Sequence, residues 1–149
     1  MVSLTASDFG NFLTHPLLQP PKVKSNKFQF SKDDVRIDPV SKEVIFHGIY
    51  DNLKWRCILV KSNEDSSAAL IKVTPFELSD DENESLRQVE LALLLTSTLS
   101  DFFNSLVFEL DGTFLNYKDL LVTAKGESPS LLLALSITVK KFPSPGLAF

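Results

Sequence analysis

The longest periodic pattern of apolar and polar residues runs through residues 83–110, NESLRQVELALLLTSTLSDFFNSLVFEL. On a helical wheel, its apolar residues occupy one half of the circumference. These residues are Leu86, Val89, Ala92, Leu93, Leu95, Leu99, Phe102, Phe103, Leu106 and Val107. Because this arc is wider than the stripe of about 100° on an ordinary surface helix, we predict a helix covered on two sides, by a sheet and by another element or subunit.

The other half of this wheel is polar and predicts a solvated face. Its residues are Arg87, Glu90, Ser97, Thr98, Asp101 and Asn104. Leu94 projects from the middle of the polar half and Leu91 lies at its edge, so we expect a small apolar contact point there. The alternative is that Leu94 is a lone exposed leucine without a role.

Both ends of the helix carry signals. Acidic residues crowd its start, where free N–H groups and the helix dipole favour negative charge. They are Glu77, Asp80, Asp81, Glu82 and Glu84. A metal site is the weaker interpretation, because the segment lacks the alternating ligands and central glycine of a calcium loop. Asp111-Gly112 predicts a two-residue hairpin turn between extended segments, so we end the helix near residue 104 and begin a strand.

A short helix is predicted before Pro16, because the residue that precedes a proline disfavours helical geometry. Thr5 or Ser7 can cap this helix, and its apolar residues are Phe9, Phe12 and Leu13. Residues 16–30 are expected to form an extended arm. Its segment KVKSNKFQF predicts an edge strand with solvated lysines, and binding to an anionic surface is the alternative.

Residues 33–76 predict four strands joined by short connections, which is typical of an antiparallel meander. If Asn52 and Leu53 form the turn of the central hairpin, Tyr50 faces Trp55. One sheet face then holds Val44, Phe46, Tyr50, Trp55, Cys57 and Leu59, and the other holds Ile45, His47, Ile49, Arg56, Ile58 and Val60. Since both faces are largely apolar, we expect either cover on both sides or one face that contacts a ligand or partner.

Towards the C-terminus, an alternating pattern predicts a half-buried strand. In it, Leu131, Leu133, Leu135, Ile137 and Val139 alternate with Leu132, Ala134, Ser136, Thr138 and Lys140. The tail, residues 142–149, contains two prolines that cannot continue a sheet, and we expect it to dock on the protein itself or on a partner. Together these patterns predict a single α+β domain over residues 1–149. Its antiparallel sheet of about six or seven strands is packed by the short N-terminal helix and one long helix, about residues 83–104.

Composition narrows the class of protein. The chain has 149 residues, a net charge of −4 and 23% charged residues. The negative charge argues against nucleic acid as the main partner. The single cysteine, Cys57, excludes an intramolecular disulfide framework, so we expect an intracellular, cytoplasmic location. No stretch has the length and hydrophobicity of a membrane span, and the N-terminus lacks the pattern of a secretory signal.

The sequence contains no motif that predicts a catalytic site, a metal or a cofactor. Gly-rich phosphate loops and the HExxH, CxxC and GxSxG motifs are absent. Cys57 and His47 share the central hairpin, but the predicted register puts them on opposite faces, which argues against a nucleophilic pair. Cys57 is then expected to be a small buried residue, and His47 an ordinary core or surface histidine.

We therefore expect a non-enzymatic protein-interaction module: an adaptor, an assembly chaperone or a small complex subunit, with another protein or a second copy of itself as the partner. The candidate partner-binding residues are Leu91, Leu94, Ile45, Ile49, Arg56 and Ile58. The alternative is a cup of sheet and helix that binds a small apolar ligand. Its candidate ligand-binding residues are Tyr50, Trp55, His47 and Arg56.

Overall fold

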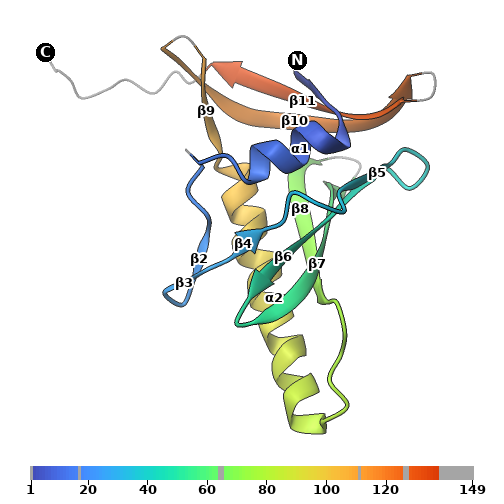
Figure 1. The fold of residues 1–149 in the computed structure, drawn as a ribbon. Coiled ribbons are helices and arrows are strands. Elements are labelled where there is room, and N and C mark those ends of the chain that lie inside the picture. The colour runs from blue at the N-terminus through green and yellow to red at the C-terminus, as the bar shows by residue number, and fades with distance from the viewer. Residues whose placement is uncertain (1, 17, 64–65, 111, 126–127, 138–149) are drawn as a thin grey trace, which may run out of the picture.

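The computed structural model describes residues 2–16, 18–63, 66–110, 112–125 and 128–137. The fold is α+β, as the pattern predicts, and the described strands pair antiparallel around one long helix (Figure 1). Instead of one sheet of about six or seven strands, they form sheets of five, four and two strands. The tail at residues 142–149, Val139 and the turn residue Asp111 lie outside the described residues.

The five-stranded sheet contains the predicted meander. Its strands are β4 (Gln29–Phe30), β5 (Arg36–Asp38), β6 (Glu43–Tyr50), β7 (Leu53–Asn63) and β8 (Ser66–Pro75). The order is β4-β6-β7-β8, and β5 also pairs with β6. β8 is therefore the last strand on its side of the sheet.

The four-stranded sheet lies across the top of the molecule in Figure 1. It has the order β1-β11-β10-β9. The strands are β1 (Val2–Leu4), β9 (Val107–Leu110), β10 (Thr113–Lys125) and β11 (Ser128–Ile137). A separate two-stranded hairpin joins β2 (Lys22–Val23) to β3 (Asn26–Lys27), so the segment predicted as an extended arm contains β2, β3 and β4.

Both predicted helices are confirmed. α1 (Ala6–Leu13) is capped by Thr5, whose hydroxyl accepts the N–H of Asp8 at 3.1 Å. α2 (Glu82–Asn104) is capped by Asp81, whose carboxylate accepts the N–H of Glu84 at 3.1 Å. Capping thus explains the acidic residue at this position. At the bottom of Figure 1, the first turns of α2 project beyond the turn between β6 and β7.

The predicted turn of the central hairpin is wrong by one position. Asp51 and Asn52, with φ of 55° and 59°, form the turn between β6 and β7. Left-handed backbone of this kind suits Asp and Asn and disfavours leucine, which excludes Leu53 from the turn. His47 therefore pairs with Arg56, and Phe46 pairs with Cys57. Because the register moves by two residues, the two predicted faces are unchanged.

A row of polar side chains on α2 closes the outer edge of β8. We call Thr96, Ser100 and Asn104 the polar ladder. They accept the N–H groups of Val73, Ile71 and Ala69 respectively, each at 2.9 Å. Four helical residues rise about 6 Å and two strand residues about 6.7 Å, so the spacings match. Asn104 also donates to the carbonyl of Ala69 at 2.8 Å.

This contact corrects the predicted orientation of α2. Asn104, assigned to the solvated half of the wheel, is partly buried against β8. Leu86, Val89 and Leu93, assigned to the buried half, are instead exposed. The helix is rotated because hydrogen bonds to the strand edge, and not apolar contacts alone, fix the side that it turns towards the sheet.

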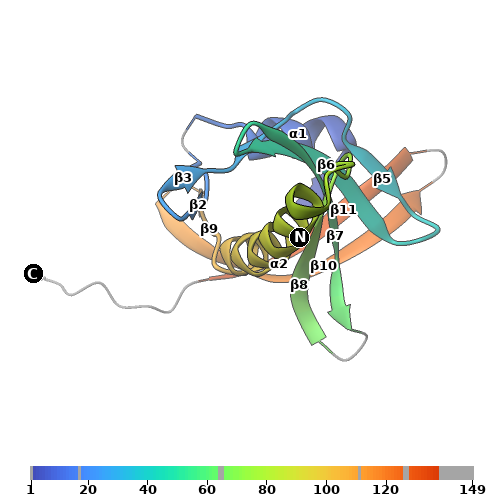
Figure 2. The ribbon, with the colours of Figure 1, turned by 90° about the horizontal axis from the view of Figure 1, so that it is seen from below.

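The core lies between α2, α1, the inner face of the five-stranded sheet and the four-stranded sheet. Figure 2 shows these elements curving around α2. From α2, the buried side chains are Leu95, Leu99 and Phe103. The aromatic rings of Phe9 and Phe46 meet edge to face at 5.4 Å. Phe28 covers Gly48 so closely that a Cβ there would lie 2.1 Å from its ring, so only glycine fits at this position.

We predict that Ser100→Ala lowers the free energy of unfolding by about 1–3 kcal/mol, because it leaves the buried N–H of Ile71 without a partner. The control is Ser97→Ala, which removes an exposed hydroxyl from the same helix and should change stability by about 0.5 kcal/mol or less. Urea unfolding measures both. Equal effects would show that the polar ladder adds nothing beyond helix propensity.

Candidate interaction surfaces

The side of the five-stranded sheet that faces away from the core combines apolar and basic residues. We call it the outer sheet face. Opposed residues in the register share a face, and two rows define this one: Arg36, Ile45, Ile58 and Lys72, and then His47, Arg56 and Thr74. Ile49 and Lys54 form the next row, beside Phe76. The register therefore brings Ile45, Ile49, Arg56 and Ile58 together.

Phe76 directly follows β8, and two positively charged side chains lie over its aromatic ring. Lys54 Nζ lies 4.2 Å from the centre of its ring, and Arg56 Cζ lies 5.8 Å from it. The ring is exposed enough to meet a partner as well. Cation–π contacts hold both side chains over the ring, so two positive groups lie together beside Phe76 at the surface.

His47 is the buried polar group of this face, with 8% of its surface exposed. Its ring meets Phe76 edge to face at 5.6 Å. Neither ring nitrogen has a hydrogen-bond partner within the part of the chain that the structure describes. Burial lowers the pKa of His47, and the positive charges of Lys54 and Arg56 lower it further, while Asp34 acts in the opposite direction. The ring is therefore neutral at neutral pH.

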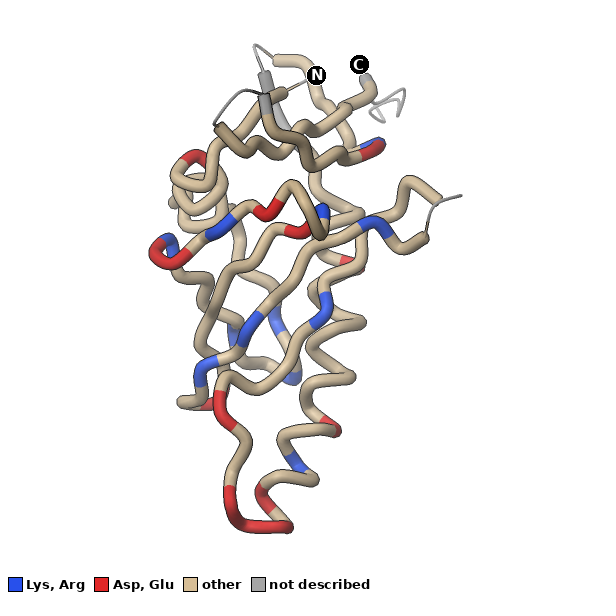
Figure 3. The backbone as a smooth tube through the Cα atoms, turned by 90° about the vertical axis from the view of Figure 1, so that its right-hand side faces the viewer, with Lys and Arg blue, Asp and Glu red and all other residues tan. Residues whose placement is uncertain are grey.

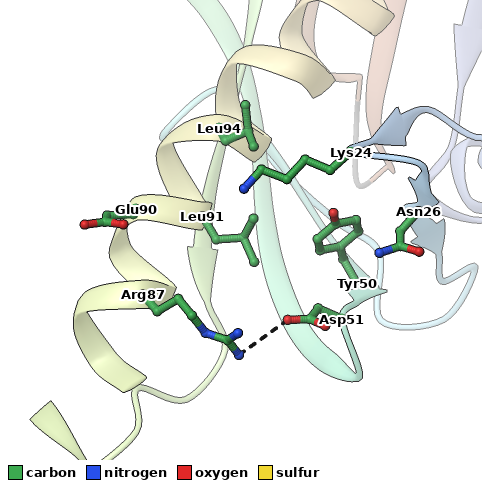
Figure 4. A pocket seen from close by; sticks show the side chains of 8 residues that line it. All are labelled: Lys24, Asn26, Tyr50, Asp51, Arg87, Glu90, Leu91 and Leu94. Atoms are coloured by element: carbon green, nitrogen blue, oxygen red, sulfur yellow. Dashed lines mark ion pairs between the residues drawn. The ribbon is translucent and has the colours of Figure 1, made fainter. Parts of the chain in front are cut away.

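A groove of about 380 Å³ lies on the other side of the molecule, between α2, the β2–β3 hairpin and the end of β6 (Figure 4). Leu91 and Leu94 line it from α2, and Tyr50 lines it from β6. The Tyr50 hydroxyl donates to the carbonyl of Val23 at 2.7 Å. An ion pair of 3.5 Å between Arg87 and Asp51 spans one end, so the lining is part apolar and part charged.

The projecting half of α2 carries an apolar row that we call the helix stripe: Leu86, Val89 and Leu93. Their side chains are 58%, 48% and 71% exposed. On the helical wheel, the stripe falls in the same sector as the polar ladder, and Leu86 shares the direction of Asn104. The stripe therefore lies nearer the start of α2, before the residues that bond to β8.

Acidic side chains gather where β8 leads into α2, and we call this segment the acidic end. Its members, all exposed, are Glu77, Asp80, Asp81, Glu82 and Glu84. Leu78, 57% exposed, lies among them. Figure 3 shows Asp and Glu positions at this end of the molecule and Lys and Arg positions on the strands above it.

The structure distributes the residues of the predicted sites over different surfaces. Leu91 and Leu94 lie at the groove, away from the outer sheet face. Tyr50 and Trp55 point to the inner side of the sheet, where Trp55 is fully buried, and His47 and Arg56 belong to the outer face. These four residues therefore do not line one cavity.

Several surface residues were missed by sequence reasoning. Lys54, Lys72 and Phe76 belong to the outer sheet face, and alternation along β7 and β8 could have placed the two lysines. The helix stripe could not have been found from the helical wheel. Its two leucines and its valine lie in the same apolar half of the wheel as the residues that are buried in the core.

The remaining chemistry is limited. Cys57 is fully buried on the inner face, as predicted, and burial raises the pKa of its thiol far above the ordinary range. His47 lies on the opposite face, so the two do not form a pair. Across the described ranges, no three His, Cys, Asp or Glu residues come together as metal ligands. Neither described helix has the length and apolar character needed to cross a bilayer.

Comparison with protein-family models, with curated proteins and with solved structures finds no significant match to this chain. The inferences that follow therefore rest on its own residues.

We predict that the free energy of unfolding falls as the pH is lowered through about 6.5, the ordinary pKa of histidine. The unfolded chain takes up a proton there that His47 in the folded protein resists, because its pKa is lowered; above that pH the penalty is absent. His47→Phe should flatten this pH dependence, measured by urea unfolding between pH 5 and 8. In Arg56→Gln, an NMR titration should show a higher pKa for His47. An unchanged slope in His47→Phe would contradict the assignment.

Proposed function

We propose that this chain is a non-enzymatic protein-interaction module whose contact surface includes the helix stripe of α2. The observation that carries this proposal is the exposure of Leu86, Val89 and Leu93 on one side of a helix that otherwise packs tightly. Apolar patches of this kind are rare on isolated proteins and are typical of binding sites. Spacing at i, i+3 and i+7 suits contact with another helix or with a sheet face.

The surroundings of the stripe support a protein partner. Leu78 lies near its start and acidic side chains flank it, which is the arrangement of an apolar contact with a polar rim. An adaptor, an assembly chaperone and a small complex subunit all need such a surface, and the stripe supports the three roles equally. α2 is anchored along β8 by the polar ladder, so it can present the stripe without first becoming ordered.

A small-molecule ligand is the second candidate, and the groove beside Tyr50 is the observation that favours it. Its volume of about 380 Å³ falls in the range of small-ligand sites. Charged Lys24, Arg87 and Glu90 share the lining with Leu91 and Leu94. Desolvating these charges opposes binding of a purely apolar ligand, so we favour the protein partner.

A photo-reactive phenylalanine derivative in place of Leu93 tests the first proposal. In an extract of the native cells, we expect a discrete crosslinked product, because a partner protein covers this position. The control is the same derivative in place of Val40, 91% exposed in the turn between β5 and β6, which should give none. Leu86→Asp should reduce the product at position 93 several-fold. Equal labelling from both positions would contradict a specific contact.

Binding of an apolar fluorescent dye tests the second candidate. If the groove binds a ligand, the dye should bind with a 1:1 stoichiometry and Leu94→Trp, which fills the groove, should abolish binding. Leu121→Trp, at an exposed position on β10, is the matched control and should leave it unchanged. Identical dye binding in both variants would exclude the groove.

A further inference from the structure

We infer that the outer sheet face binds the acidic end of a second copy of this chain, in a dimer with two-fold symmetry. This inference rests on the proposed function, because it identifies the partner for the surface that includes the helix stripe. Its basis is that the outer sheet face and the acidic end are neighbours with opposite charge. Both also carry exposed apolar residues.

The positive half of the surface consists of Arg36, Lys54, Arg56 and Lys72, all exposed. We call these four the basic patch. Within the described ranges, none of them forms an ion pair with an acidic side chain, although the protein as a whole carries a charge of −4. Like charges on one sheet face repel one another. A negatively charged partner would therefore relieve a repulsion that Asp34 and Asp38, beside this face, only partly offset.

The negative half is the acidic end. Asp81 is engaged as the cap of α2, and Glu84 lies 3.6 Å from Arg87. Glu77, Asp80 and Glu82 make no ion pair among the described residues. Exposed Leu78 lies among them and Leu86 follows in the first turns of α2, so the acidic end offers both charge and apolar contact to the isoleucines of the outer sheet face.

The two halves are neighbours in the same molecule. The N–H of Phe76 donates to the carbonyl of Lys54 at 3.0 Å, and Glu77 follows directly. A two-fold axis near Phe76 would place the basic patch of each copy against the acidic end of the other, forming both contacts at once. Such an isologous interface closes on itself and makes a discrete dimer, whereas a single one-way contact would propagate into a chain of molecules.

Exposed apolar side chains are concentrated on the elements of the proposed interface. Six of the eleven exposed large apolar residues among the described residues belong to it: Ile49, Phe76, Leu78, Leu86, Val89 and Leu93. Phe76 joins the outer sheet face to the segment that leads into α2, so one interface could cover all six. Apolar burial would supply affinity, and the paired charges would set the orientation.

Nucleic acid is the other anionic partner that a basic face could attract. Its phosphates would have to lie beside the acidic end, where Glu77 and Asp80 would repel them, and they would gain nothing from the exposed Ile49. The arrangement therefore favours a polypeptide that offers an acidic segment to the basic patch and a basic surface to the acidic end. A second copy of this chain offers both.

A charge-swap experiment tests the dimer. The first variant, Arg56→Glu with Lys72→Glu, places two negative charges in the basic patch. The second, Glu77→Lys with Asp80→Lys, places two positive charges in the acidic end. By light scattering over a range of concentrations, we expect a dimer for the native chain and dissociation constants raised at least roughly tenfold for each variant. Mixing the two variants should restore the dimer, because the introduced glutamates then meet the introduced lysines while the other contact keeps its native charges. A misfolded surface would not be repaired by mixing.

Lys22→Glu with Lys27→Glu, on the β2–β3 hairpin, is the control for net charge and should remain dimeric. The native dimer should also weaken between about 0.1 and 1 M salt. A native chain that stays monomeric, a mixture that stays monomeric, or a basic patch that binds single-stranded RNA instead would overturn the inference. If the native chain is monomeric but position 93 crosslinks to a different protein, the dimer fails and the proposed function stands.

Discussion

The hydrogen bonds between α2 and the edge of β8 decide how the rest of this structure is arranged. An edge strand presents free N–H and C=O groups that would otherwise pair with water or another chain. Here Thr96, Ser100 and Asn104 supply the missing partners. A helix and a strand can run together in this way because four helical residues and two strand residues advance by nearly the same distance. The contact closes one edge of the sheet and fixes the rotation of the helix about its axis.

This rotation determines which apolar residues remain outside. A helix that packed by hydrophobic contact alone would bury the centre of its apolar arc. α2 instead turns part of its polar side to β8, and Leu95 and Leu99 on the adjacent side enter the core. Leu86, Val89 and Leu93, nearer the start of the helix, are left exposed. The exposed stripe is therefore a consequence of a specific polar contact, and it is held rigidly by that contact.

The sequence could predict the elements and the faces better than their contacts. Alternation placed Phe46 and Cys57 on the inner face and Ile45 and Ile58 on the outer face, and even a wrong turn position left these assignments intact because the register shift was two residues. Asn104 was misplaced because a wheel counts polarity and cannot show that an asparagine amide will bond to a distant strand. That information exists only once residues 69 and 104 are brought together by the fold.

Net charge also does not show how the charges are distributed. A total of −4 is compatible with a positive surface when charges of opposite sign are separated. In the fold, alternation along β7 and β8 sends Lys54, Arg56 and Lys72 to one face, while the requirement for anions at the start of α2 concentrates Asp and Glu at the end of the same surface. Each half follows from an ordinary local rule. Their proximity follows from the short connection at Phe76, which joins the edge strand to the helix. The separation of charge is thus set by β5, β7 and β8 on one side and by the start of α2 on the other, and the proposed self-recognition uses only these elements.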